Sequence, residues 1–397
     1  MASICYALIL LAPISLAVTL IAHVTVFIVL SPDRRRRSGP TPPISILKPV
    51  KGVEDGLHEN LASLANQDYP EYEILVAAED ALDPALDVAR RVQAENPEAR
   101  IRIRAGSRRL GLNPKVNLLA TLAFHAEHEH LLISDSNVRA GTRYLRDTAA
   151  ELADPQVGLV TNVLVARGAD RLGGILECLQ LNSFVASATS FARVIAGRAC
   201  VIGKSMLFRR RDLARLGGFW AVRNVLAEDY VIGRAFELAG YKVALSPHVV
   251  TTVNHGWTAE RFINRQLRWA QMRRRLSLPA YVGELLLNPV LWIALALCAL
   301  AVAHREIDVR AAALACAGTA MKCASDALLS KRLRGEWLPL PHVTLIPLKD
   351  LLMAGIWLVG AFRRTVNWRG NLLRIEAGSA LTPYQPAVLD EPLREVA

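Results

Sequence analysis

The sequence lacks the cysteine patterns that bind transition metals. None of its six cysteines belongs to a Cys-x-x-Cys pair or to a cluster with histidine, so any metal must be held by oxygen atoms. The sequence also has no long internal repeat, and no low-complexity segment beyond the proline- and arginine-rich residues 32–43. These absences exclude a zinc site of the cysteine type and a repeat architecture.

A phosphate-binding P-loop is missing as well, although one stretch resembles it. Five residues separate Gly197 from Gly203-Lys204-Ser205, whereas a P-loop requires four. The shifted register would place Arg198 where the first glycine belongs. We therefore exclude a P-loop NTPase, while Gly203 and Ser205 remain candidates for lining a substrate pocket.

Apolar and basic residues, by contrast, are abundant. The 397 residues are 52% hydrophobic with a mean hydropathy of +0.25, which suits one α/β domain with several membrane segments. The formal charge of +11 favours anionic partners, namely lipid headgroups, a nucleotide diphosphate or nucleic acid. Because the basic residues cluster beside apolar segments and no nucleic-acid-binding module is present, we expect the first two and no nucleic acid.

An apolar run near the N-terminus predicts a membrane anchor. Residues 4–30 are long enough to cross a bilayer, which takes ~20 residues, and Arg34 to Arg37 follow at once. A cleaved signal peptide has the reverse order of charge and apolar run. We predict an uncleaved anchor at residues 1–31 and a tether at 32–43, with the chain beyond it in the cytoplasm.

Further candidate crossings lie near the C-terminus. They occupy residues 285–303, 311–329 and 345–362, within a predicted membrane region of residues 279–364 that precedes a tail at 365–397. Lys322 and Asp326 interrupt the middle segment, and Lys349-Asp350 interrupt the last one. Basic residues flank the last segment on both sides, so charge does not orient it, and a re-entrant segment is an open alternative.

The region between these ends predicts an α/β domain at residues 44–278. Strand-like runs occur at residues 44–47, 73–77, 101–103, 130–133 and 157–160, with helical spacing at 57–64, 84–94 and 116–126. This alternation predicts β-α units around a parallel sheet, which is a nucleotide-binding architecture. Residues 173–203 are mildly apolar and predict an amphipathic surface helix on the membrane.

Two carboxylates end apolar runs where an open α/β sheet forms its ligand crevice. Asp135, followed by Ser136 and Asn137, is the predicted metal ligand, because Mg²⁺ and Mn²⁺ favour such oxygen atoms. Asp80 ends an earlier strand and is predicted to accept a hydrogen bond from a nucleotide base or ribose. Asp-Ser-Asn and strand-end carboxylates also occur in ordinary turns. The functional interpretation of Asp135 and of Asp80 therefore depends on the presence of the other motifs.

Two later groups complete the predicted site. Lys115 enters a helix from a Gly- and Pro-marked loop, where an ammonium group can meet phosphate. Asp229 is the predicted base that removes a proton from an acceptor hydroxyl, with Glu228 as the alternative base. Both carboxylates also suit an ordinary helix start.

A basic and aromatic motif follows on a predicted helix. Arg265 and Arg268 share a face, with Trp269 beside them, and could hold a diphosphate or acceptor near the membrane. An interfacial helix without such a role is the alternative.

Together these motifs resemble the ceramide glucosyltransferase family. The resemblance covers residues 44–269 and includes Leu47-Lys-Pro-Val-Lys51-Gly52, Asp68-Tyr-Pro70, Gly111-Leu-Asn-Pro-Lys115-Val-Asn117, Asp135-Ser136, Ala227-Glu-Asp229-Tyr230 and Arg265-x-x-Arg268-Trp269. It implies a bacterial inner-membrane member with a GT-A, Rossmann-like domain facing the cytoplasm.

The resemblance also implies roles for individual residues. Asp80 and Asp135 would bind the UDP-sugar and a divalent cation, Asp229 would be the base, and Arg265, Arg268 and Trp269 would complete the site. The implied reaction is inverting transfer from UDP-glucose to ceramide, giving a β-glucoside.

Three alternatives differ in substrate or class. Bacterial hopanoid N-acetylglucosaminyl transferases share much of the framework, and processive polysaccharide synthases share the carboxylates and the Arg-Trp motif but need more crossings. A non-catalytic membrane scaffold would use the same acidic residues only as caps and turns.

Overall fold

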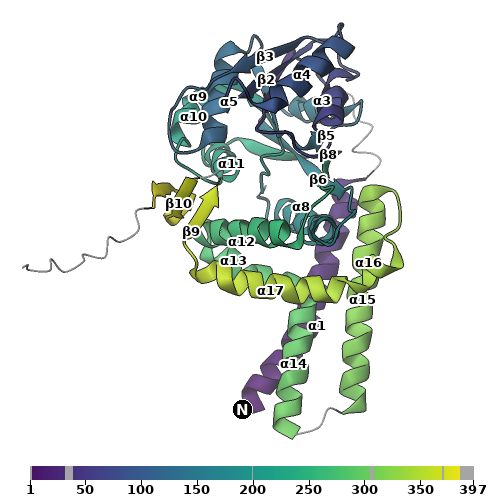
Figure 1. Cartoon of the computed structure of the whole chain (residues 1–397). Coiled ribbons are helices and arrows are strands. Elements are labelled where there is room, and N and C mark those ends of the chain that lie inside the picture. Colours follow the sequence, from purple (N-terminus) through teal and green to yellow (C-terminus); the bar gives the residue numbers. More distant parts are fainter. Residues whose placement is uncertain (1, 32–38, 199, 305–307, 369–370, 385–397) are drawn as a thin grey trace, which may run out of the picture.

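The computed structural model describes residues 2–31, 39–198, 200–304, 308–368 and 371–384, and Figure 1 shows three tiers. An α/β domain stands at one end. The helices α1 (Ala2–Val29), α14 (Pro289–His304) and α15 (Val309–Arg334) extend away from it. Between these tiers, α12 (Ala259–Leu276), α13 (Leu278–Gly283) and α17 (Ile346–Phe362) run across the direction of the other three helices.

The central sheet has eight strands in the order β3-β2-β1-β4-β7-β6-β8-β5. Its first half consists of β1 (Ile44–Pro49), β2 (Tyr72–Ala78), β3 (Ile101–Ala105) and β4 (His130–Ser134), which are all parallel. The helices α3 (Leu57–Ala65), α4 (Pro84–Glu95) and α5 (Pro114–His125) connect them. These elements confirm the β-α units predicted from the hydrophobic pattern.

The five predicted strands run in one direction, as predicted, but the sheet also contains the antiparallel strands β5 and β7, at which no strand was predicted. The strand β7 (Ser205–Arg209) is antiparallel to both β4 and β6 (Val157–Arg167), and β5 (Val138–Arg139) is antiparallel to β8 (Lys242–Val253). Strand β6 is parallel to β8. Apolar alternation identifies a strand but carries no information about its direction, so β7 could not be oriented from its sequence.

The segment predicted as a surface helix is instead buried beneath the sheet. It forms α7 (Leu172–Gln180), a π-helical turn η2 (Leu181–Val185) and α8 (Ala186–Val194). Asn182 is 1% exposed, and its amide exchanges hydrogen bonds with the backbone N–H and C=O of Ala166 in β6, at 2.7 and 2.9 Å. Asn182 is therefore hydrogen-bonded inside the protein, whereas the sequence pattern treats such a polar residue as part of a solvated face.

Within the described residues, three helices are long and apolar enough to cross a membrane, and they indicate a membrane protein. They are α1, α15 and the segment of residues 340–362 that contains α17; α13 with α14 makes a fourth candidate, bent by 75°. Of the two predicted alternatives for α17, its course across α1, α14 and α15 favours a segment that does not cross with them (Figure 1). A Cβ at Gly360 would lie 2.6 Å from Ala270 Cβ, so α17 packs closely on α12.

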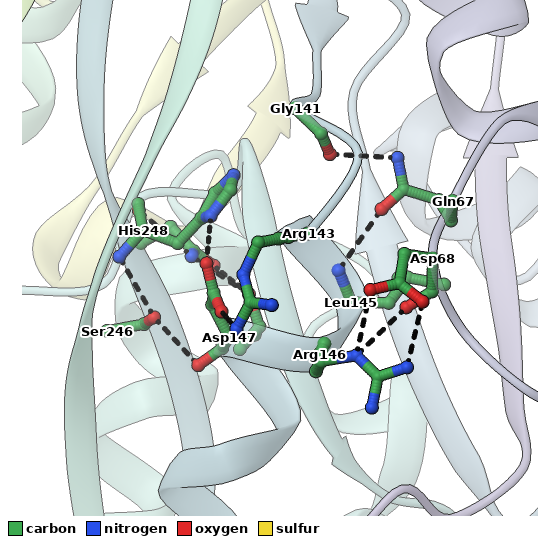
Figure 2. A network of polar contacts seen from close by, with 11 residues as sticks. Gln67, Asp68, Gly141, Arg143, Leu145, Arg146, Asp147, Ser246 and His248 are labelled. Carbon is green, nitrogen blue, oxygen red and sulfur yellow. Dashed lines mark hydrogen bonds and ion pairs between the residues drawn. The ribbon is translucent and has the colours of Figure 1, made fainter. Parts of the chain in front are cut away.

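A polar network fastens α6 (Tyr144–Ala149) to the loop before β2 and to β8 (Figure 2). Arg146 Nη2 lies 2.9 Å from Asp68 Oδ1, and Leu145 N–H donates to Gln67 Oε1 at 3.2 Å. His248 Nδ1 lies 2.9 Å from Asp147 Oδ2. The Asp68-Tyr-Pro70 motif of the family resemblance thus has a structural contact here.

The last described residues form a second, antiparallel sheet of β9 (Thr365–Trp368), β10 (Asn371–Ile375) and β11 (Leu381–Pro383). These strands lie within the segment predicted as a tail. Leu226 N–H donates to Ser379 O at 2.9 Å, and Ala227 N–H donates to Ser379 Oγ at 3.0 Å. The small sheet therefore braces the residues that precede α11 (Glu228–Leu238).

Candidate active site

A cavity of about 790 Å³ opens at the carboxyl end of β4. Its walls come from the starts of α5 and α11, the turn before β7, α12 and β9. Most of the predicted site residues line it, namely Lys115, Asp135, Glu228, Asp229, Arg265, Arg268 and Trp269. Residues from four separate stretches of sequence thus meet at one place.

Asp80 does not line this cavity. It is exposed in the turn after β2, where its Oδ1 accepts a hydrogen bond from Leu82 N–H at 2.9 Å. The neighbouring Asp83 caps α4 by accepting from Ala85 N–H at 2.9 Å, and it also accepts from Gly52 N–H at 2.9 Å. Because β2 and β4 are parallel, Asp80 shares the edge of the sheet with Asp135, two strands away.

Asp135 follows β4 directly, and its carboxylate lies between two lysines. Lys115 Nζ is 2.8 Å from Oδ1, and Lys204 Nζ is 3.6 Å from Oδ2. Burial alone would raise the pKa of Asp135, but the two ammonium groups outweigh it and lower the pKa to about 2. The carboxylate is therefore ionised at neutral pH and can bind a cation.

Lys115 reaches the cavity because α5 starts immediately before it. Asn113 caps the helix by accepting from Val116 N–H at 3.1 Å, and Pro114 occupies the first helical position. Lys115 Nζ also lies 2.9 Å from Glu228 Oε1. Burial opposes the charged amine, yet Asp135 and Glu228 raise the pKa of Lys115 above its usual range. One ammonium group thus joins the carboxylates of β4 and α11.

The first turn of α11 holds the two candidate bases. Asp229 Oδ2 accepts from Gly203 N–H at 2.5 Å, and Oδ1 accepts from Tyr230 N–H at 2.8 Å. Burial and the adjacent Glu228 raise the pKa of Asp229 to about 6. Glu228, by contrast, is occupied by Lys115 and by Asn113 Nδ2, 3.3 Å from its Oε2. The geometry therefore favours Asp229 as a proton acceptor near neutral pH.

The α12 residues form a basic and aromatic wall. The Arg265 guanidinium lies 4.5 Å from the ring centroid of Trp269 and 5.1 Å from that of Trp257. Its Nη1 is 3.1 Å from Glu177 Oε1, and Gln266 Nε2 donates to Glu177 Oε2 at 2.7 Å. Glu177 of α7 is fully buried, so it fixes Arg265 in place from behind.

The sequence pattern of glycosyl transferase family 21 matches residues 7–381, which decides the family. The chain belongs to glycosyl transferase family 21. It is 27% identical over 238 residues to ceramide glucosyltransferase 3 of Caenorhabditis elegans, covering 58% of this chain and 50% of the relative. It is also 33% identical over 129 residues to a ceramide glucosyltransferase of Komagataella phaffii, covering 30% and 25%. These names confirm the predicted family. The chain spans about half the length of the first relative and about a quarter of the second.

The fold of this family 21 member resembles that of a solved mannosyltransferase from Pyrobaculum calidifontis. That structure, in complex with GDP-Man and Mn²⁺, superposes with a TM-score of 0.50 at 21% identity, covering 88% of this chain and 99% of the other. The likeness confirms the predicted GT-A fold of the α/β domain.

The described residues contain no group of three His, Cys, Asp or Glu side chains placed to hold a metal. Lys204 Nζ contacts both Asp135 Oδ2 and Asn137 Oδ1. One carboxylate and one amide oxygen are of the ligand type that Mg²⁺ or Mn²⁺ takes, and these ions complete their shells with water and phosphate oxygen atoms. The residues present therefore fit the predicted divalent cation by ligand type, and Asp135 stays its predicted acidic ligand.

Several cavity residues of this family 21 protein escaped the sequence reasoning. Lys204 was considered only as part of a rejected P-loop, and Glu177, which lies behind the cavity wall and contacts Arg265, is in an apolar helix. Thr365, Asn367 and Trp368 line the cavity from β9, although no motif singles them out. A lysine next to a glycine before a strand was a usable signal for Lys204, whereas only the fold brings β9 to the site.

Proposed function

We propose that the chain is an inverting glycosyltransferase that moves glucose from UDP-glucose to a hydroxyl of ceramide or a similar sphingolipid. The observation that carries this proposal is that one cavity contains both Asp229, whose pKa is raised to about 6, and Asp135, whose carboxylate is ionised. The same protein has helices that are long and apolar enough to cross a membrane. The ceramide glucosyltransferase relatives support the choice of substrates.

Asp229 acts as the general base in this mechanism. The acceptor hydroxyl oxygen attacks the anomeric carbon of the sugar, the bond from that carbon to the diphosphate oxygen breaks, and UDP leaves with the bonding electron pair. Asp229 takes the hydroxyl proton as the new bond forms. Attack from the face opposite the leaving group converts the α-linked donor into a β-glucoside. The N–H groups of Gly203 and Tyr230 hold the carboxylate in position.

The other charged residues serve the donor. Asp135 and Asn137 would hold Mg²⁺ or Mn²⁺, whose chemistry is to neutralise charge on the leaving diphosphate. Lys115 keeps Asp135 and Glu228 together, and Arg268 with Trp269 contributes the cavity wall where a diphosphate or sugar would lie. Asp80 lies outside the cavity at the same edge of the sheet as Asp135, and it would contact the uracil or ribose there.

Membrane orientation follows from the same proposal. Arg34 to Arg37 come after α1, and this basic run supports a cytoplasmic α/β domain in a bacterium, where nucleotide-sugars are made. The transverse helices α12, α13 and α17 would then lie along the inner-membrane surface and present the cavity to lipid.

The deciding experiment is UDP release by the purified membrane protein, with UDP-glucose, UDP-galactose or UDP-N-acetylglucosamine and with ceramide or a hopanoid polyol. We expect release that depends on both UDP-glucose and ceramide. Release only with UDP-N-acetylglucosamine and hopanoid would retain the mechanism and change the substrates. Elongation of the product into a polymer would instead establish a polysaccharide synthase.

A further inference from the structure

Lys204 has a fixed place opposite the predicted metal ligand. Strands β4 and β7 are antiparallel, and Ser134 pairs with Ser205 as their last partners. The next position along this register sets Lys204 across from Asp135, both just beyond the strand ends. The sheet itself therefore directs the lysine to the cavity.

The contacts of Lys204 agree with this placement. It is 7% exposed and lines the cavity, with its Nζ against Asn137 Oδ1 and 3.6 Å from Asp135 Oδ2. These are the two oxygen donors that fit a divalent cation. Lys115 occupies the other oxygen of Asp135, so both sides of this carboxylate face a resident positive charge.

We propose that Lys204 is a donor-binding residue that supplies positive charge to the diphosphate of the nucleotide-sugar and competes with the divalent cation for Asp135 and Asn137. This proposal rests on the proposed glycosyl transfer and adds a residue to its donor site. An ammonium group is a point charge on a flexible stem, so it can move from a carboxylate to a nearby phosphate oxygen. The preceding Gly203 donates its N–H to Asp229. The turn before β7 therefore positions both the proposed base and the Lys204 ammonium group.

Two binding measurements on the full-length protein in detergent test the role of Lys204. The first is calorimetric titration with UDP in EDTA, where no metal contributes. Lys204→Met should weaken UDP binding roughly 10- to 100-fold, the worth of a hydrogen bond to a charged group. The second is Mn²⁺ titration followed by EPR without nucleotide. The same variant should bind Mn²⁺ at least about threefold more tightly, because a competing cation has gone.

Control variants separate this role from general damage. Lys242→Met removes an exposed lysine at the start of β8 that pairs with Asp154, and it should change neither measurement. Lys204→Arg keeps the charge and should bind UDP within about fivefold of the parent protein. Unchanged UDP affinity in Lys204→Met would overturn the proposal, and so would loss of both ligands together with a lower melting temperature.

The outcome also distinguishes failure of the Lys204 assignment from failure of the proposed function. If the parent protein binds GDP but not UDP, the proposed donor is wrong, and Lys204 is then judged by the same titration with GDP. If the parent protein binds neither nucleotide, both proposals fail.

Discussion

Two clusters of paired acids and lysines lie at different depths in this protein. The cavity cluster consists of Lys115, Asp135, Lys204, Glu228 and Asp229. The helix cluster consists of His23, Lys322, Asp326, Lys349 and Asp350 on α1, α15 and α17. Both link several elements through ion pairs, yet only the first opens onto a large cavity.

The helix cluster is closed. Lys322 Nζ pairs with Asp326 and lies 3.3 Å from Asp350, while Lys349 pairs with Asp350 and lies 3.3 Å from Gln180 Oε1. The adjoining cavity is only about 40 Å³, room for a few water molecules. The ionisable residues of these apolar helices therefore pair with one another, and the ion pairs hold the helices together.

The difference between the clusters is one of access. Asp135 retains 24% exposure of its side chain, whereas Asp326 retains 3%. A carboxylate that faces 790 Å³ of open space can exchange a lysine for a ligand, and one enclosed by helices cannot. Charge content alone would have ranked the two clusters as equals.

The strongest test of the comparison removes the base from the cavity cluster. Asp229→Asn should lower turnover about 10²- to 10⁴-fold, the usual contribution of general base catalysis, while UDP affinity is retained. Steady-state kinetics and UDP titration measure the two quantities. Asp154→Asn, an exposed carboxylate on the far surface, is the matched control. Turnover that falls no further than in this control would assign the base to another group, with Glu228→Gln the next variant to measure.

The matching test removes a charge from the helix cluster. Lys322→Met leaves Asp326 without its lysine inside the protein, and breaking such a buried pair costs about 3–5 kcal/mol. We expect a clearly lower melting temperature in detergent, with turnover per folded molecule unchanged. Loss of turnover at an unchanged melting temperature would mean that the two clusters do not differ as described.

A smaller effect is expected from pH. Because the pKa of Asp229 is raised to about 6, its carboxylate is ionised above this value and protonated below it. Turnover should therefore fall as pH decreases, by about tenfold between pH 7 and pH 5. The pH profile at saturating substrate measures this change. A profile that is flat across pH 6 would contradict the assignment of Asp229.

The contrast between the clusters also shows what sequence could reveal. Asp135 and Asp229 were found because each follows a strand or starts a helix, and such local features survive in a linear pattern. Lys115 and Arg265 joined them through motif spacing. The charged residues of the helix cluster were visible in their segments, but nothing in the sequence showed that Lys322 would face Asp350.

The misses have a common physical origin in long-range pairing. The direction of β7, the burial of α7 and the arrival of β9 at the cavity all depend on contacts between segments far apart in the chain. Lys204 faces Asp135 because β7 runs antiparallel to β4, and no strand was predicted at β7, so this site residue was not identified from the sequence. Periodicity reports which face is buried and is silent about the partner.

The most delicate test lies on α7, which touches both clusters. Glu177 holds Arg265 at the cavity, and Gln180, one turn later, accepts from Lys349 of the helix cluster. Glu177→Gln should lower kcat/KM roughly tenfold by letting the guanidinium shift, because small misplacements in an active site are costly. Its melting temperature should change little, since an amide of the same size keeps the contact with Gln266.

Gln180→Leu is the matched variant one turn further along the same helix. It should lower the melting temperature by removing an acceptor from Lys349 and leave kcat/KM within about twofold of the parent protein. Turnover and thermal unfolding of the two variants, measured side by side, would distinguish the role of Glu177 from that of Gln180. If both variants changed the same quantity, α7 would couple the clusters, and an open catalytic site and a closed structural one would no longer be separate regions.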